Sequence, residues 1–291
     1  MLDDQTRFNF PASGITTLPL SFTPQVLRCN AAGPGGHPLR VLLDTGTDPS
    51  AIDLGLARRL GLRLGDFAHG QDAASDTVRF TESVLPWLRL GELELRDLYV
   101  LALDLSQAPF EVDLVLGYNV LCQLTLTVNY RAEQLQLGHP DLEPLPPGPD
   151  GAILPLHFFE HFPALADAHL RCNLPGGPFS ELALPLLTID TGSNGALTLS
   201  SDLAAQAGLD YADQVTPGQG RGFVGGVAVR HALAPSLRLG PFELAQVELD
   251  APEAEAGDLG RAGRANLGNR LLARFARMTL DYRRGWCVLD R

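Results

Sequence analysis

Two copies of the tripeptide Asp-Thr-Gly, at residues 44–46 and 190–192, are the part of the sequence best suited to chemistry. Each copy follows a short apolar run that is typical of a buried strand ending in a turn. If the two motifs meet, their carboxylates cannot both ionise easily, so one proton is shared and one pKa is raised. Such a pair can take a proton from water with one carboxylate and donate a proton to a carbonyl oxygen with the other. This chemistry needs no metal and no covalent nucleophile.

The two motifs belong to a longer internal repeat. Landmarks recur in the same order in both halves: LRCN at 27–30 and 170–173, LRLG at 88–91 and 237–240, and a Leu-Gly pair ending at Gly117 and Gly268. Repeated order of this kind indicates a duplication. A two-fold duplication places equivalent residues on opposite sides of a pseudo-two-fold axis, and the two carboxylates meet if the motifs lie near that axis.

The repeat predicts the organisation of the elements that hold the motifs. We expect an N-terminal β lobe over residues 1–140, a proline-rich connector over 141–150 and a C-terminal β lobe over 151–291. The prolines suit a stiff, exposed connection because they fix φ and remove backbone donors. Each half shows an apolar strand before the aspartate, a short helix after it, several strands, a second short helix and a closing hairpin. The fold class is therefore mainly β, with two short helices in each half.

The D-T-G-[ST] motifs, with the apolar element Val115-Leu116-Gly117, resemble those of pepsin- and retropepsin-type aspartic proteases. The endings of the two halves, LGYNVLCQLTLTVNYRAEQLQL and LGNRLLARFARMTLDYRRGWCVL, particularly resemble bacterial retropepsin-like proteases. The resemblance covers nearly the whole chain. It implies an all-β, bilobal, pseudo-two-fold fold with short helices in each lobe, and endopeptidase activity on a peptide or protein substrate. Retropepsins supply one lobe per chain and dimerise, so a chain with both lobes implies a monomer.

The resemblance also assigns roles to matching residues. Asp44 and Asp190 would form the catalytic dyad that activates water. Thr45 and Thr191 would hold the dyad rigid through reciprocal hydrogen bonds across the axis.

The neighbouring positions would support the dyad. Gly46 and Gly192 would let backbone N–H groups approach the carboxylates. Thr47 and Ser193 could each donate a hydroxyl hydrogen bond to the outer carboxylate oxygen. Because such donation favours the charged form, we expect activity in acid, at about pH 3–6. Asp48 matches an acidic residue with which retropepsins bind the substrate backbone, and a cap for the next helix is the alternative.

Proteases of this type cover the substrate with a flap hairpin. Residues 216–230 contain five glycines and lie where the family places its flap, so Gly222, Phe223, Gly225 and Gly226 are candidate substrate-contacting residues, with Phe223 as an apolar tip. The equivalent stretch 66–84 has a single glycine and lacks the tyrosine of pepsin-type flaps. In the second half, Asn266 replaces the apolar residue expected before Leu267-Gly268, which predicts a weaker element there.

Composition excludes several other classes. The chain has 291 residues, 45% of them hydrophobic, and a formal net charge of −12 without a basic run, which argues against sequence-independent nucleic-acid binding. No apolar stretch is long enough to predict a membrane span. We expect no signal peptide or pro-segment and a cytoplasmic location, because the N-terminus is acidic and cysteines are few; a chain from which a leader has been removed is the alternative. Neither the cysteines nor the histidines, including His157 and His161, show metal-ligand spacing, so we expect no metal or cofactor.

Two other interpretations remain open at this point. The first is a catalytically inactive peptide-binding protein of the same fold. The second is a scaffold in which the two aspartates only accept hydrogen bonds within their own turns.

Overall fold

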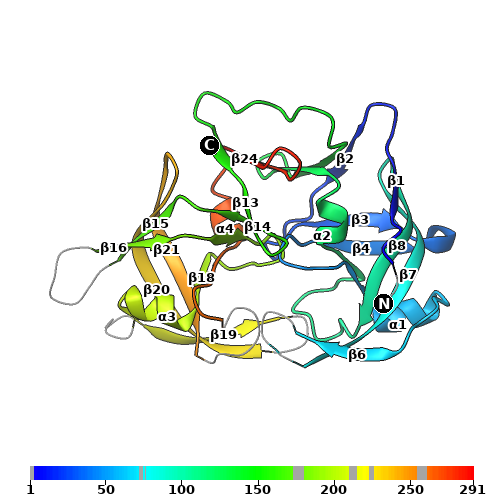
Figure 1. The fold of residues 1–291 in the computed structure, drawn as a ribbon, viewed down its shortest axis with the longest axis horizontal. Helices are drawn as coiled ribbons and strands as arrows, with labels where there is room; N and C mark the ends of the chain where they lie inside the picture. The colour runs from blue at the N-terminus through cyan, green and yellow to red at the C-terminus, as the bar shows by residue number, and fades with distance from the viewer. Residues whose placement is uncertain are drawn as a thin grey trace.

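Three β-sheets form most of the structure, a computed structural model that describes residues 3–71, 75, 77–172, 180–209, 215–222, 226–253 and 261–291. One sheet belongs to each half of the chain, and the third joins strands from both halves. Figure 1 shows the two lobes to the right and left, with β2 and β24 of the joining sheet above them. The predicted all-β, two-lobed fold with short helices is confirmed.

The sheet of the first lobe has eight strands in the order β1-β8-β5-β9-β4-β3-β7-β6. Its strands are β1 (Arg7–Asn9), β3 (Arg28–Ala32), β4 (Pro38–Leu43), β5 (Ala51–Asp53), β6 (Phe67–Gly70), β7 (Val78–Leu90), β8 (Leu93–Leu103) and β9 (Leu114–Leu116). The last three residues of β4 are buried, as expected for an apolar strand between two neighbours. This strand leads directly into the first Asp-Thr-Gly motif.

The sheet of the second lobe has ten strands, with β13-β14-β17-β22-β18-β21-β20-β15-β16 in order and β19 paired to β20. Its strands are β13 (His157–Phe159), β14 (Phe162–Leu165), β15 (Ala168–Cys172), β16 (Ser180–Leu184), β17 (Leu187–Ile189), β18 (Leu197–Leu199), β19 (Thr216–Arg221), β20 (Gly226–Leu239), β21 (Phe242–Pro252) and β22 (Ala265–Leu267). The apolar strand β17 leads into the second motif, as β4 leads into the first.

The third sheet joins the lobes. It runs in the order β12-β24-β23-β10-β11-β2, and its strands are β2 (Ile15–Pro19), β10 (Thr125–Asn129), β11 (Gln134–Gly138), β12 (Ala152–Pro155), β23 (Arg277–Asp281) and β24 (Trp286–Asp290). At its centre β10 of the first half pairs with β23 of the second, and Thr127 lies opposite Thr279. One hydrophobic core, which includes Leu126 and Leu280, extends through both lobes. Apolar packing therefore joins the lobes as well as backbone hydrogen bonds.

The helices in the described ranges are short. They are the 3-10 helix η1 (Pro34–Gly36), α1 (Leu54–Arg59), α2 (Tyr118–Leu121), α3 (Ser201–Gln206) and α4 (Asn269–Leu272). The Asp53 carboxylate accepts a hydrogen bond from the Leu56 N–H and caps α1, so the alternative role of Asp48 as the cap of this helix is wrong. Across the described residues, none of the helices combines the length and apolar character that crossing a membrane requires.

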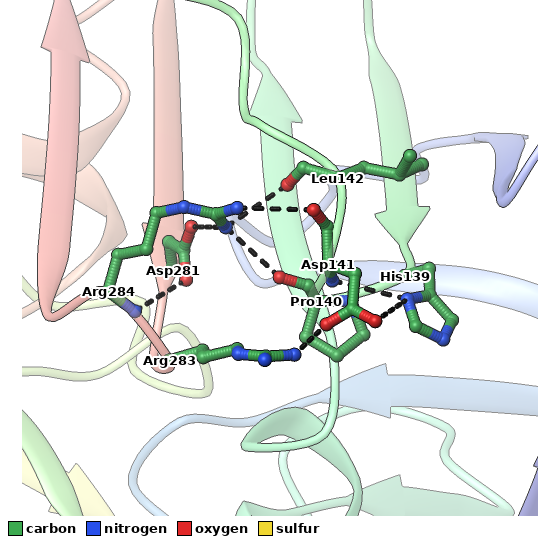
Figure 2. A network of polar contacts seen from close by, with 7 residues as sticks. All are labelled: His139, Pro140, Asp141, Leu142, Asp281, Arg283 and Arg284. Atoms are coloured by element: carbon green, nitrogen blue, oxygen red, sulfur yellow. Dashed lines mark hydrogen bonds and ion pairs between the residues drawn. The ribbon is translucent and has the colours of Figure 1, made fainter.

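The proline-rich connector 141–150 contains no helix or strand, yet its start is tied to the turn between β23 and β24 (Figure 2). The Arg284 guanidinium donates hydrogen bonds to the carbonyl oxygens of Pro140, Asp141 and Leu142 at 3.0, 3.2 and 3.1 Å. The same guanidinium pairs with the buried carboxylate of Asp281 at 2.8 Å. The connector is thus held by side chains of the second half.

Candidate active site

Each Asp-Thr-Gly motif begins where a buried strand ends beside a parallel neighbour. In the first lobe β4 pairs with β9, and the Asp44 N–H donates to the Leu116 carbonyl oxygen at 2.9 Å. In the second lobe β17 pairs with β22, and the Asp190 N–H donates to the Leu267 carbonyl oxygen at 3.0 Å. The same local construction therefore directs both aspartates to the junction of the lobes.

Thr45 and Thr191 connect the two motifs through reciprocal hydrogen bonds. The Thr191 hydroxyl accepts from the Thr45 N–H at 3.1 Å and donates to the Leu43 carbonyl oxygen at 2.7 Å. The Thr45 hydroxyl accepts from the Thr191 N–H at 3.0 Å and donates to the Ile189 carbonyl oxygen at 2.6 Å. Both threonines are buried, so water cannot replace these four bonds.

We expect the substitution Thr191→Val to destabilise the fold by about 3 kcal/mol, because it leaves the buried Thr45 N–H and Leu43 carbonyl without a partner. Urea unfolding measures this change. Thr191→Ser is the matched control, since it retains the hydroxyl, and it should recover most of the loss. Equal stability of the valine variant and the unmodified protein would show that these bonds do not hold the motifs together.

The structure brings the two carboxyl groups together across the axis. A methyl group on Gly192 would lie 2.3 Å from Cγ of Asp44, and one on Gly46 would lie 2.9 Å from Cγ of Asp190. Each carboxyl group therefore packs against the backbone of the opposite motif, in space that only glycine leaves open. Asp44 is 4% exposed.

The two carboxyl groups accept different sets of hydrogen bonds. Asp44 Oδ1 accepts from the Gly46 N–H at 2.8 Å, and Asp44 Oδ2 accepts from the Thr47 hydroxyl at 2.7 Å. The Thr47 contact agrees with the sequence prediction.

Around Asp190 the prediction for the hydroxyl of Ser193 is wrong. Asp190 Oδ1 accepts from the backbone N–H groups of Gly192 and Ser193 at 2.9 and 3.0 Å. The Ser193 hydroxyl instead accepts from the Gly195 N–H at 3.2 Å. The outer oxygen, Asp190 Oδ2, accepts from the Asn266 side-chain amide at 2.7 Å.

Asn266 is thus a site residue. From the sequence alone, a polar residue at this position predicts only a weaker strand before Leu267-Gly268. The strand β22 forms as β9 does in the first lobe, and Asn266 is only 7% exposed. The available signal was a polar residue at a place where the repeat and the family pattern both call for an apolar one. A buried polar side chain needs a hydrogen-bond partner, and here the partner is Asp190.

Burial and proximity make both carboxyl groups harder to ionise. Burial raises the pKa of Asp44 to about 7, with the charge of Asp190 as the next cause, while hydrogen bonds from Thr47 and Gly46 oppose the rise. Burial also raises the pKa of Asp190, and the hydrogen bond from Asn266 is the largest opposing influence. Because the groups interact, the protons leave the pair in two steps that belong to the dyad as a whole.

A cleft of about 1310 Å³ opens over the two aspartates and is lined by residues of both lobes. Apolar side chains from the first lobe, including Val78, Phe80 and Phe110, contribute to its wall. Thr188, Ser193 and Asn194 line it from the second lobe.

A comparison with known families matches residues 32–120 and 186–269 to the model described as aspartyl protease. Each match contains one Asp-Thr-Gly motif and the apolar strand pair that positions it. The chain belongs to the aspartyl protease family. No curated protein matches the chain.

The candidate flap of this family member is a hairpin of β19 and β20, in which Arg221 lies opposite Gly226. Gly222 lines the cleft, and Gly226 begins β20. Phe223 and Gly225 lie outside the described residues. Figure 1 shows β19 and β6 along the lower edge of the two lobes, on the side opposite β2 and β24.

The corresponding hairpin of the first lobe, β6 and β7, also reaches the cleft. Gly70, Gln71, Val78 and Phe80 line it. The Arg261 guanidinium of the second lobe donates to the Gln71 side-chain oxygen at 2.8 Å. The hairpin of β6 and β7 therefore lies at the cleft, as the hairpin of β19 and β20 does, although its sequence departs from that of pepsin-type flaps.

Asp48 lines one part of the cleft and is paired across the lobes. Its Oδ2 lies 2.5 Å from Nδ1 of His161, in the turn between β13 and β14. The His161 ring stacks on Tyr118 with centroids 4.6 Å apart. His161 is therefore packed against the cleft wall. Among the described residues, no group of three or more His, Cys, Asp or Glu side chains could hold a metal ion.

Proposed function

We propose that the protein is an aspartic endopeptidase that hydrolyses peptide bonds with a water molecule activated by Asp44 and Asp190. The observation that carries the proposal is the packing of each carboxyl group against the glycine of the opposite motif. Membership of the aspartyl protease family supports proteolysis in general. Since one chain supplies both aspartates, the proposed active form is a monomer.

The proposed reaction uses one proton shared by the dyad. The ionised carboxylate takes a proton from water as the water oxygen bonds to the carbonyl carbon, and the protonated carboxyl donates its proton to the carbonyl oxygen. When the C–N bond breaks, the proton taken from water passes to the leaving nitrogen, and a hydroxyl of the intermediate returns a proton to the other aspartate. The cycle leaves the dyad with one proton, as it began.

The proposed substrate is an extended peptide segment. The cleft is bounded by two hairpins and by both lobes, an arrangement that suits backbone hydrogen bonding to an added strand. Gly222, which follows β19 and lines the cleft, has no side chain to hinder the close approach of a peptide backbone.

Digestion of a denatured protein followed by mass spectrometry of the products tests the proposal. We expect cleavage at internal peptide bonds and inhibition by pepstatin, although insensitivity to pepstatin alone leaves the proposal standing. Saturable peptide binding without any product would favour the inactive peptide-binding alternative.

We expect a bell-shaped dependence of kcat/KM on pH, with its alkaline limb near neutrality. The pKa of Asp44 is raised to about 7, so activity should fall as pH rises past that value and the shared proton is lost. In acid the second carboxylate becomes protonated, and this produces the acid limb of the curve. Because the pKa of Asp190 is also raised, we expect the acid limb at a higher pH than the pKa of an ordinary aspartate would give. A maximum well above neutrality would contradict the shared proton.

A further inference from the structure

We propose that Asn266 is a positioning residue that keeps Asp190 ionised, so that Asp190 accepts the proton of the attacking water and Asp44 carries the shared proton. This rests on the proposed function, which needs one proton on the dyad. The inference follows from the types of hydrogen-bond donor around each carboxyl group.

Asp190 is surrounded by donors that cannot reverse their role. Two backbone N–H groups bind its Oδ1, and the Asn266 amide binds its Oδ2. An N–H group can only donate, so each of these bonds favours the charged form of the carboxylate. With donors on both oxygens, Asp190 is the carboxyl group better arranged to stay ionised.

Asp44 is surrounded differently. Its Oδ1 accepts one N–H, and the partner of its Oδ2 is the Thr47 hydroxyl. A hydroxyl can donate or accept, so Thr47 can receive a proton held on Asp44 Oδ2 without leaving an unsatisfied group. Asp44 is also the more deeply buried of the two, and burial disfavours its charged form.

The orientation of the Asn266 side chain is supported by a second polar residue. Thr188 of β17 lies directly opposite Asn266 of β22, and its hydroxyl donates to the Asn266 amide oxygen at 2.8 Å. With its oxygen engaged by Thr188, the amide presents its NH₂ group to Asp190.

The first lobe has an apolar pair at the equivalent place. There Leu42 of β4 lies opposite Val115 of β9, and both belong to a buried hydrophobic cluster. The polar pair Thr188 and Asn266 is therefore a difference between two halves that otherwise share their construction. Because of this pair, the two carboxyl groups of an almost symmetric dyad have chemically different surroundings.

Several other ionisable groups lie in or beside the cleft. Asp48 pairs with His161, the Arg264 guanidinium lies over the Phe159 ring, and burial raises the pKa of Tyr282. The remaining acidic residues that line the cleft are Asp3, Asp4, Glu82 and Glu160. The direct contacts described above, rather than these groups, distinguish Asp44 from Asp190.

The test is the pH dependence of kcat/KM in the variant Asn266→Val, which copies the first-lobe residue. Loss of the amide donor makes Asp190 easier to protonate, so the acid limb should move upward by about one pH unit. Gln206→Ala is the matched control, since Gln206 carries an exposed amide at the end of α3 in the same lobe, away from the residues that line the cleft, and it should leave both limbs in place. Thr188→Val, which retains Asn266 but releases its amide, should shift the acid limb in the same direction by less.

Two outcomes would overturn the proposal. An unchanged acid limb with a uniform loss of kcat would show that Asn266 only supports the strand. A downward shift of the alkaline limb would show that Asn266 accepts a proton held by Asp190.

NMR titration of protein labelled with ¹³C at the aspartate carboxyl carbons gives the same answer without catalysis. The two resonances are assigned from their loss in the Asp44→Asn and Asp190→Asn variants. We expect Asp190 to ionise at lower pH than Asp44, and Asn266→Val to reduce the difference. If the protein cleaves no peptide, this titration still decides where the proton lies, so the two proposals can fail separately.

Discussion

Replacing either aspartate of the dyad by asparagine is expected to lower kcat/KM by at least about 1,000-fold. Asn cannot take a proton from water, and it cannot donate one without an unfavourable change of its amide. The expected loss is thus the whole contribution of acid–base catalysis by that residue. Digestion of a denatured protein by each variant at several pH values measures it.

The same variants also allow stability to be measured separately from catalysis, because the stability of a variant should depend on pH differently from that of the unmodified protein. Burial raises the pKa of Asp44 to about 7, so the folded state holds a proton that the unfolded chain releases at lower pH. Stability of the unmodified protein therefore falls as pH rises from about 4 to about 7. Asp44→Asn removes this ionisation, and its melting temperature relative to the unmodified protein should rise over the same interval.

Asp190→Asn is expected to be the less stable of the two variants. Its amide NH₂ must face either the N–H groups of Gly192 and Ser193, which cannot accept, or Asn266, which can accept only if its amide oxygen turns away from the Thr188 hydroxyl. At position 44 the NH₂ group can face the Thr47 hydroxyl, which accepts. Proteolysis that survives in both variants would show that the dyad does not take part in the mechanism. If the unmodified protein has no activity and the variants only lose stability, the scaffold interpretation is favoured.

Much of the site follows from the duplication in the sequence. Two Asp-Thr-Gly motifs, each after an apolar run and each at the same place in a repeat, predict equivalent strand ends on opposite sides of a pseudo-two-fold axis. The structure has those strand ends at Leu43 and Ile189, with the reciprocal bonds of Thr45 and Thr191 between them. Both helices that follow the motifs also form, and each is followed by a glycine with positive φ, Gly61 after α1 and Gly208 after α3, which is a local signal for the end of a helix.

The features that the sequence did not predict are departures from symmetry. Ser193 matches Thr47 in the repeat, but its hydroxyl accepts from the Gly195 N–H, and Asn266 occupies the oxygen that the hydroxyl would have bound. The replacement of the Ser193 hydroxyl by the Asn266 amide depends on the pairing of β17 with β22. These strands are distant in sequence, so no local sequence pattern predicts it. The pairing of Asp48 with His161 likewise depends on the hairpin of β13 and β14 reaching the other lobe.

Gly192→Ala is expected to reduce kcat/KM by at least about 100-fold, because the new methyl group would lie 2.3 Å from Cγ and 2.4 Å from Oδ2 of Asp44. Carbon atoms in contact prefer about 3.5–4.0 Å, so either the carboxyl group or the backbone must move. The carboxyl group is held by the Gly46 N–H and the Thr47 hydroxyl, and displacing it breaks those bonds. Gly46→Ala should have a smaller effect, since its methyl group would lie 2.9 Å from Cγ of Asp190.

Gly138→Ala is the matched control for the alanine substitutions, because a methyl group there would lie 3.7 Å from its nearest neighbour. It should leave both activity and urea unfolding nearly unchanged. A double variant then locates the effect: if Gly192→Ala acts by displacing Asp44, adding it to Asp44→Asn should cost little further activity. Independent, multiplicative losses would place the damage elsewhere in the cleft, and full activity of Gly192→Ala would contradict the close packing of the two motifs.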